Sequence, residues 1–182
     1  MYELLTLATD ITEKRGLTLI VTQGTARQSK TDLIANLILN GTLLLVAADE
    51  WLPGFLLPRI MRGHTTEIKE LTSRLRTVCA STSLRLLDSL SNISAAGEPI
   101  LVLDFLNTFY DPNMRLSLRF RVLRQCCNHL KRIALHRPIM IMTQEMSGQE
   151  YEQFLQILCG IAQKTLYLEP APEPPSLQLA LL

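Results

Sequence analysis

Several features that mark special classes of protein are missing from this sequence. Its apolar runs are interrupted by Arg, Asp or Pro well before the roughly 20 residues that a membrane-spanning helix needs. The first residues lack the basic start of a secretory signal. A strong charge of one sign is also missing, because the formal net charge is +1, so no global attraction to nucleic acid or membrane is expected. We therefore expect no membrane partner, and a cytoplasmic protein, or a nuclear one in a eukaryote.

Paired cysteine motifs are missing too. The four cysteines are Cys79, Cys126, Cys127 and Cys159. They show no C-x-x-C spacing and no accompanying histidine cluster, so neither a disulfide framework nor a zinc site is indicated. We expect them to be small buried apolar residues in a reducing compartment.

What is present is an alternation of strand and helix patterns. The length of 182 residues and the hydrophobic fraction of 47% suit one core, so we expect a single domain over 1–170 and a Pro-rich tail over 171–182. The strands are expected at 17–22, 42–47, 75–80, 100–103, 138–143 and 165–168. The helices are expected at 2–14, 32–40, 55–62, 67–74, 83–93, 116–135 and 150–162. This order predicts a three-layer α/β/α domain with a mostly parallel central sheet.

A motif resembling a phosphate-binding loop follows the first strand. Gly24-x-x-x-x-Ser29-Lys30-Thr31 differs by one residue from the Walker A pattern G-x-x-x-x-G-K-[ST]. In such a loop, backbone N–H groups at a helix N-terminus face the phosphates. Lys30 would contact the β- and γ-phosphates, and Thr31 would ligate Mg²⁺. Ser29 stands where the pattern has glycine. The alternative interpretation is an ordinary strand-to-helix turn capped by Ser29 or Thr31.

Polar residues follow the other buried strands. Asp49 and Glu50 follow the second strand, Asp104 the fourth, and Gln144 the fifth. Ligands bind beyond the carboxyl ends of the strands in an open α/β sheet, so we expect these residues to converge with the loop. A phosphate loop, an acidic residue for Mg²⁺ and a strand-end Gln are parts that phosphoryl transfer uses.

The order of these parts resembles the RecA/Rad51 family of ATPases over roughly residues 15–170. The resemblance is carried by residues 74–88, by the Walker B-like strand and turn at 100–109, and by 119–125 and 139–144. It implies a RecA-like fold that binds ATP and Mg²⁺. Lys30 and Thr31 would then hold the phosphates and the metal, and Asp104 would be the metal carboxylate. Gln144 would sense the γ-phosphate, and Glu50, or less favourably Asp49, would activate water.

The chain also departs from that family. It lacks the N-terminal polymerisation domain, and the loop after Gln144 is short. It therefore looks most similar to minimal Rad51 paralogues, including those that accompany SWIM-domain proteins in Shu-type hetero-oligomers. The resemblance implies an ATP-binding accessory protein of homologous recombination and DNA repair, with weak or partner-dependent ATPase activity and a SWIM-domain or Rad51-like partner. One alternative is a pseudo-ATPase that serves as a structural and DNA-binding subunit. Another is a KaiC-type or Elongator-type relative acting on protein or tRNA.

A basic stretch completes the pattern, because no acidic residue occurs from 112 to 144. The helical period places Arg121, Arg124, Lys131 and Arg132 on one face and apolar residues on the other. Together with Arg115 and Arg119, which match the family's first DNA loop, they predict contacts to the backbone of DNA, expected to be single-stranded. Only Tyr110 and Phe120 offer stacking faces nearby, so base-specific readout is not indicated. The alternative is an ordinary solvated outer helix.

Overall fold

The computed structural model describes residues 15–23, 27–47 and 68–168 of the chain. The helices expected over 2–14 and 55–62 and the tail over 171–182 lie outside these residues. So do the candidate site residues Gly24, Asp49 and Glu50.

The described residues contain a sheet of six strands whose neighbouring pairs are all parallel. The strands are β1 (Gly16–Thr22), β2 (Leu43–Ala47), β3 (Leu75–Cys79), β4 (Ile100–Leu103), β5 (Pro138–Gln144) and β6 (Lys164–Leu168). Their spatial order is β3-β2-β4-β5-β1-β6. The predicted parallel α/β architecture is therefore confirmed.

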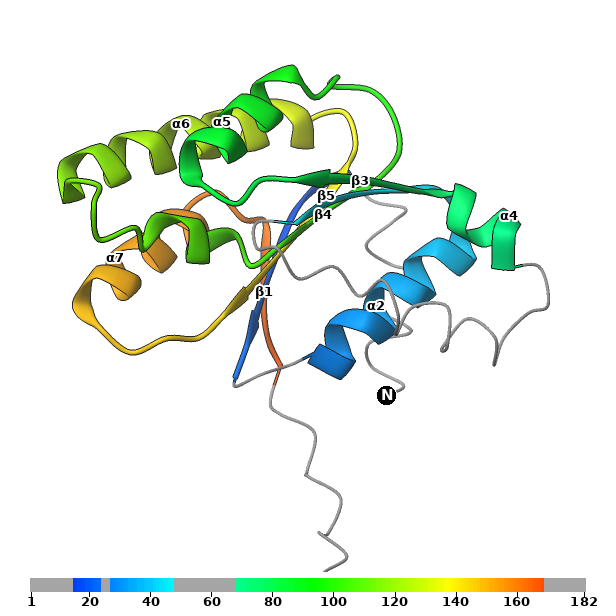
Figure 1. Ribbon diagram of the computed structural model, residues 1–182, viewed down its shortest axis with the longest axis horizontal. Coiled ribbons are helices and arrows are strands. Elements are labelled where there is room, and N and C mark those ends of the chain that lie inside the picture. The colour runs from blue at the N-terminus through cyan, green and yellow to red at the C-terminus, as the bar shows by residue number, and fades with distance from the viewer. Residues whose placement is uncertain (1–14, 24–26, 48–67, 169–182) are drawn as a thin grey trace, which may run out of the picture.

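Helices cover both faces of this sheet (Figure 1). On one face lie α2 (Arg27–Asn40) and α4 (Ile68–Ser73). On the other lie α5 (Ser83–Asn92), α6 (Leu116–Ala134), α7 (Gln149–Cys159) and the 3₁₀ helix η1 (Phe105–Phe109). Within the described parts of the chain, no helix combines the length and the apolar character that crossing a membrane requires.

The central strands are apolar on both sides because each side faces a helical layer. In β4, Ile100 and Val102 join the core beneath α5, α6 and α7, whereas Leu101 and Leu103 join the core beneath α2. The residues of β5 alternate in the same way. Successive side chains of a strand point to opposite faces, so a strand covered on both faces is an unbroken apolar run.

Several element boundaries differ from the predicted ones. Helix α2 begins at Arg27, whereas the predicted helix began at residue 32. The prediction missed the first turn because its polar residues show no apolar periodicity. Helix α7 ends at Cys159, whereas the predicted helix ended at residue 162. At this end, the Gly160 N–H donates to the Gln156 carbonyl. Thr82 caps the start of α5, because its side-chain hydroxyl accepts from the Arg85 N–H at 3.3 Å.

The cysteine prediction is confirmed for two residues and wrong for a third. Cys126 and Cys127 lie on the buried side of α6, whereas Cys79 is exposed and Cys159 is half-buried. Cys79 ends β3, which lies at the edge of the described sheet with β2 as its one neighbour among the described strands and is largely open to solvent. Burial raises the pKa of each of the Cys126 and Cys127 thiols to about 12, which removes their nucleophilic thiolate form at neutral pH.

Thiol labelling tests this distribution of cysteines. We expect a disulfide-exchange reagent to react first with Cys79 in the native protein and with Cys126 and Cys127 only after unfolding. The Cys79→Ser variant should lose the fast phase and keep the slow one. Fast labelling of Cys126 and Cys127 in the folded protein would contradict the packing of α6 on the sheet.

Candidate functional site

A buried ion pair lies at the carboxyl edge of the sheet. The Lys30 Nζ is 2.5 Å from the Asp104 Oδ1, although the two residues are 74 positions apart in the sequence. Lys30 is 7% exposed and Asp104 is 5% exposed. The structure thus brings together two of the residues that the sequence analysis assigned to phosphate and metal.

The strand order explains how these residues meet. Lys30 lies near the start of α2, which follows β1, and Asp104 follows β4 directly. Strand β5 lies between β1 and β4, so these two strands are separated by two strand spacings, or about 9.6 Å. The long Lys30 side chain bridges this separation. Gln144, the last residue of β5, is placed by the sheet between the two strands that carry the ion pair.

Asp104 adopts an uncommon backbone conformation, with φ 52° and ψ 37°. Among the described residues, it alone has a positive φ without being glycine. Asp visits this left-handed region more readily than most residues because its short polar side chain bonds locally. The turn sends the chain from β4 straight into η1. Such conformations cluster at functional sites, where surrounding structure holds them in place.

The start of α2 supplies the other groups of the site. Ser29, Lys30 and Thr31 lie in its first two turns, and no acidic residue lies in its first turn. Thr31 is fully buried. A helix N-terminus of this kind favours an anion through its free N–H groups and its dipole. Because Ser29 is the third residue of α2, the backbone around it is helical.

Because the ion pair is buried, breaking it is expected to lower the stability of the fold. The other ion pairs between described residues each have at least one side chain more than a third exposed, as in Arg76–Glu98. Lys30 and Asp104 have side chains that are 9% and 7% exposed. Removing one partner of a buried pair leaves an unpaired charge in a poorly solvated place.

The side chains at this edge carry the chemical groups that a complex of magnesium and a nucleotide needs. Lys30 offers a cation for phosphate oxygens, and Thr31 and Asp104 offer a hydroxyl and a carboxylate for a hard divalent cation. Mg²⁺ is usually held by one or two protein oxygens together with waters and substrate phosphates. Accordingly, a site of this type needs no cage of acidic residues, and the described residues contain no group of three or more His, Cys, Asp or Glu side chains that could hold a metal.

The end of β5 is fixed from two sides. The Tyr151 hydroxyl donates to the Gln144 carbonyl at 2.8 Å, and the Glu145 N–H donates to the Thr22 carbonyl at 2.7 Å. Tyr151 is 2% exposed. Burial is the main cause that raises its pKa to about 12, so it remains a protonated donor at neutral pH. Sequence reasoning missed Tyr151, because an apolar or aromatic residue at helical spacing is usually a core residue.

The aromatic residues near the site pack mainly on one another. Tyr110 stacks on Tyr151 with ring centroids 6.5 Å apart and an interplanar angle of 23°. Tyr110 also contacts Phe154, as does Phe120. Desolvation by burial raises the pKa of Tyr110 well above its usual range. Tyr110, which the sequence suggested as a stacking face, is half-buried and packs against these aromatic neighbours.

Five of the six predicted DNA-contacting residues are exposed. They are Arg115, Arg121, Arg124, Lys131 and Arg132, and none forms an ion pair with another described residue. Arg119 differs. Its Nη1 is 2.9 Å from the Glu150 Oε2, and its Nε donates to the Met114 carbonyl at 3.0 Å. Arg119 thus braces the start of α6 against the start of α7.

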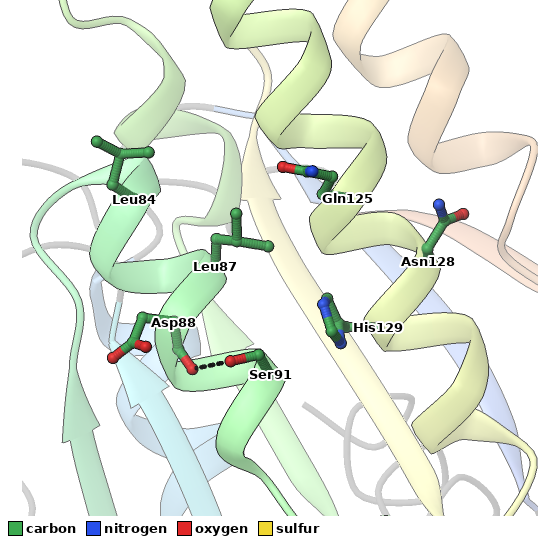
Figure 2. A pocket seen from close by; sticks show the side chains of 7 residues that line it. All are labelled: Leu84, Leu87, Asp88, Ser91, Gln125, Asn128 and His129. Carbon is green, nitrogen blue, oxygen red and sulfur yellow. Dashed lines mark hydrogen bonds between the residues drawn. The ribbon is translucent and has the colours of Figure 1, made fainter.

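A hollow of about 430 Å³ lies between α5 and α6. Figure 2 shows Leu87 and Gln125 pointing toward one another across it. The lining residues are Leu84, Leu87, Asp88, Ser91, Gln125, Asn128 and His129. They include no Lys or Arg and no Phe, Tyr or Trp, so this hollow offers neither a permanent cation nor a large aromatic surface.

Comparison with known proteins adds no family to this description. A scan against protein-family models and a search of curated proteins found no match for the chain. The structure itself defines its class as an α/β domain with a parallel sheet flanked by helices.

Unfolding experiments test the buried ion pair. Asp104→Asn and Lys30→Met should each lower the free energy of unfolding by about 3–5 kcal/mol, because each leaves a buried partner unpaired. The double variant should lose clearly less than the sum of the two single losses, as measured by urea denaturation. Additive losses below about 1 kcal/mol each, as expected of surface residues, would contradict a buried and coupled pair.

Proposed function

We propose that this protein is an ATP-binding accessory protein of the RecA/Rad51 type that acts in homologous recombination or DNA repair. The observation that carries the proposal is the buried contact between Lys30 and Asp104 at 2.5 Å. It joins a Lys at the start of a helix to an Asp at the end of another strand, on the edge where parallel α/β sheets bind ligands. The motif around Lys30 gives that edge its preference for phosphate.

Each residue has a proposed role. Lys30 and the segment from Gly24 to Ser29 hold the triphosphate, and Thr31 and Asp104 hold Mg²⁺. Gln144 contacts the γ-phosphate from the end of β5, and Glu50 orients the attacking water. When bound, Mg²⁺ would supply positive charge that offsets the negative charge developing during phosphoryl transfer.

Two features support weak rather than vigorous ATPase activity. Ser29 replaces the glycine that lets the backbone approach the phosphates without a Cβ. In addition, Lys30 already has a strong partner in Asp104, so a phosphate must compete with a buried, charge-assisted hydrogen bond. Hydrolysis then depends on a partner that favours the nucleotide-bound arrangement, in keeping with a subunit of a hetero-oligomer whose other member is a SWIM-domain or Rad51-like protein.

A second candidate function is a pseudo-ATPase subunit that keeps the fold and binds DNA without nucleotide. The substitution of Ser29 for glycine favours it. In this case the Lys30–Asp104 pair has only a structural role and seals the former phosphate site.

Calorimetry with ATP and Mg²⁺ tests nucleotide binding. Wild type should bind, and Lys30→Ala should bind at least tenfold more weakly because the phosphate-contacting cation is lost. Asp104→Asn should lose mainly the Mg²⁺-dependent part of the affinity. Circular dichroism of each variant shows whether the fold is retained.

The Ser29→Gly variant separates the two candidate functions. If wild type binds no ATP and Ser29→Gly restores binding, the pseudo-ATPase is the correct description. If neither protein binds ATP while both remain folded, the nucleotide site is rejected altogether.

DNA binding is the second part of the proposal. The exposed side of α6 carries Arg121, Arg124, Lys131 and Arg132, and its buried side packs on the sheet through residues such as Leu123 and Leu130. Within the described residues these cations form no ion pair, and exposed cations on a helix contact phosphates without reading sequence. We therefore propose that α6 contacts the DNA backbone.

Salt dependence tests this use of α6. Each phosphate contact contributes roughly 0.7–0.9 to the slope of log affinity against log salt. The double variant Arg121→Ala/Arg124→Ala should bind DNA more weakly and reduce that slope by about 1–2. Lys164→Ala, which removes an exposed cation from β6, is the matched control and should leave the slope unchanged. Equal effects of the double variant and the control would reject α6 as the contact surface.

A further inference from the structure

A second groove flanks α6 on the side of α7. It has a volume of about 420 Å³, within the range of small-molecule sites. Phe120 and Arg124 line it from α6, and Gln153, Gln156 and Ile157 line it from α7. One aromatic ring, one aliphatic side chain, two amides and one cation therefore surround the same hollow.

The aromatic ring in this groove is held in place. Phe120 is half-buried, and its ring packs edge-on against Phe154 with centroids 4.8 Å apart and an interplanar angle of 70°. Phe154 is fully buried. The part of Phe120 that lines the groove is thus a fixed apolar surface, which loses little conformational freedom when a flat ligand packs on it.

The charges around the groove favour an anionic ligand. Arg124 is exposed and forms no ion pair with another described residue. Helix α6 contains five Lys or Arg residues and no acidic residue. The acidic residues of α7 are Glu150, which pairs with Arg119, and Glu152, which is not among the lining residues. Arg124 therefore remains available for a phosphate.

We propose that this groove binds one nucleotide of a single-stranded DNA. The base packs on Phe120 and Ile157, the amides of Gln153 and Gln156 bond its polar edge, and Arg124 contacts the adjoining phosphate. An unpaired strand exposes its bases to such a groove, whereas a duplex keeps them stacked inside. The proposal rests on the DNA contacts of α6 proposed above and adds to them a contact with the base.

An abasic strand tests the base contact directly. An oligo-dT strand and an abasic strand of the same length carry the same phosphates, so only the bases differ. Stacking of one base contributes about 1–3 kcal/mol, so wild type should bind oligo-dT about fivefold or more tightly than the abasic strand at the same salt concentration. Affinities are measured by fluorescence anisotropy with labelled strands.

Substitutions then locate the contact. Phe120→Leu keeps an apolar side chain and removes the ring, so it should reduce the ratio of the two affinities toward one while leaving the abasic affinity unchanged. Arg124→Ala should weaken both strands. Leu87→Ala alters the opposite groove between α5 and α6 and should leave the ratio unchanged, which controls for general loosening of α6.

Each result has a definite meaning. A preference for oligo-dT that disappears in Phe120→Leu supports the nucleotide site. Equal binding of both strands by wild type overturns it while leaving the backbone contacts of α6 intact. Absence of binding to either strand overturns this site together with the proposed DNA contacts, and calorimetry with ATP still decides the nucleotide site separately.

Discussion

The buried contact between Lys30 and Asp104 is the constraint on which the carboxyl edge of the sheet depends. A charge that is almost fully buried is tolerated only beside an opposite charge. The contact therefore fixes the position of the start of α2 relative to the end of β4. The left-handed backbone at Asp104 lies at the same point, where the chain turns from β4 into η1. Strand β5 lies between β4, which ends at Asp104, and β1, which precedes α2.

The sequence predicts the layers of this fold and the approach of Lys30 to Asp104, but it does not predict the strand order that produces this contact. Uniform apolar runs such as 100–103 are typical of strands covered on both faces, and both cores confirm that reading. No one-dimensional pattern tells that β5 lies between β1 and β4, and this order brings Lys30 to Asp104. The first turn of α2 escaped the pattern because the residues Arg27, Gln28, Ser29 and Lys30 are all polar and show no apolar periodicity.

The surface of α6 shows a second limit of sequence reading. Helical periodicity correctly separates the buried Val122 and Leu123 from the exposed Arg121 and Arg124. It cannot show that Arg119 is engaged by Glu150, since their sequence positions are distant and the partner lies on another helix. The same holds for Tyr110 and Tyr151, whose stacking depends on how η1 and α7 meet in space. Residues that face solvent are predictable from period alone, but residues that brace two elements are not.

These braces connect the ion pair with the basic helix. Asp104 leads into η1, the carbonyl of Phe109 accepts from Arg119 at 3.5 Å, and Tyr151 contacts the end of β5. The most direct test of the central claim, that Lys30 and Asp104 form one nucleotide site, is hydrogen–deuterium exchange with and without ATP and Mg²⁺. We predict slower exchange at the start of α2 and at the junction of β4 with η1, both together. Unchanged exchange at both places at a saturating nucleotide concentration would contradict the claim.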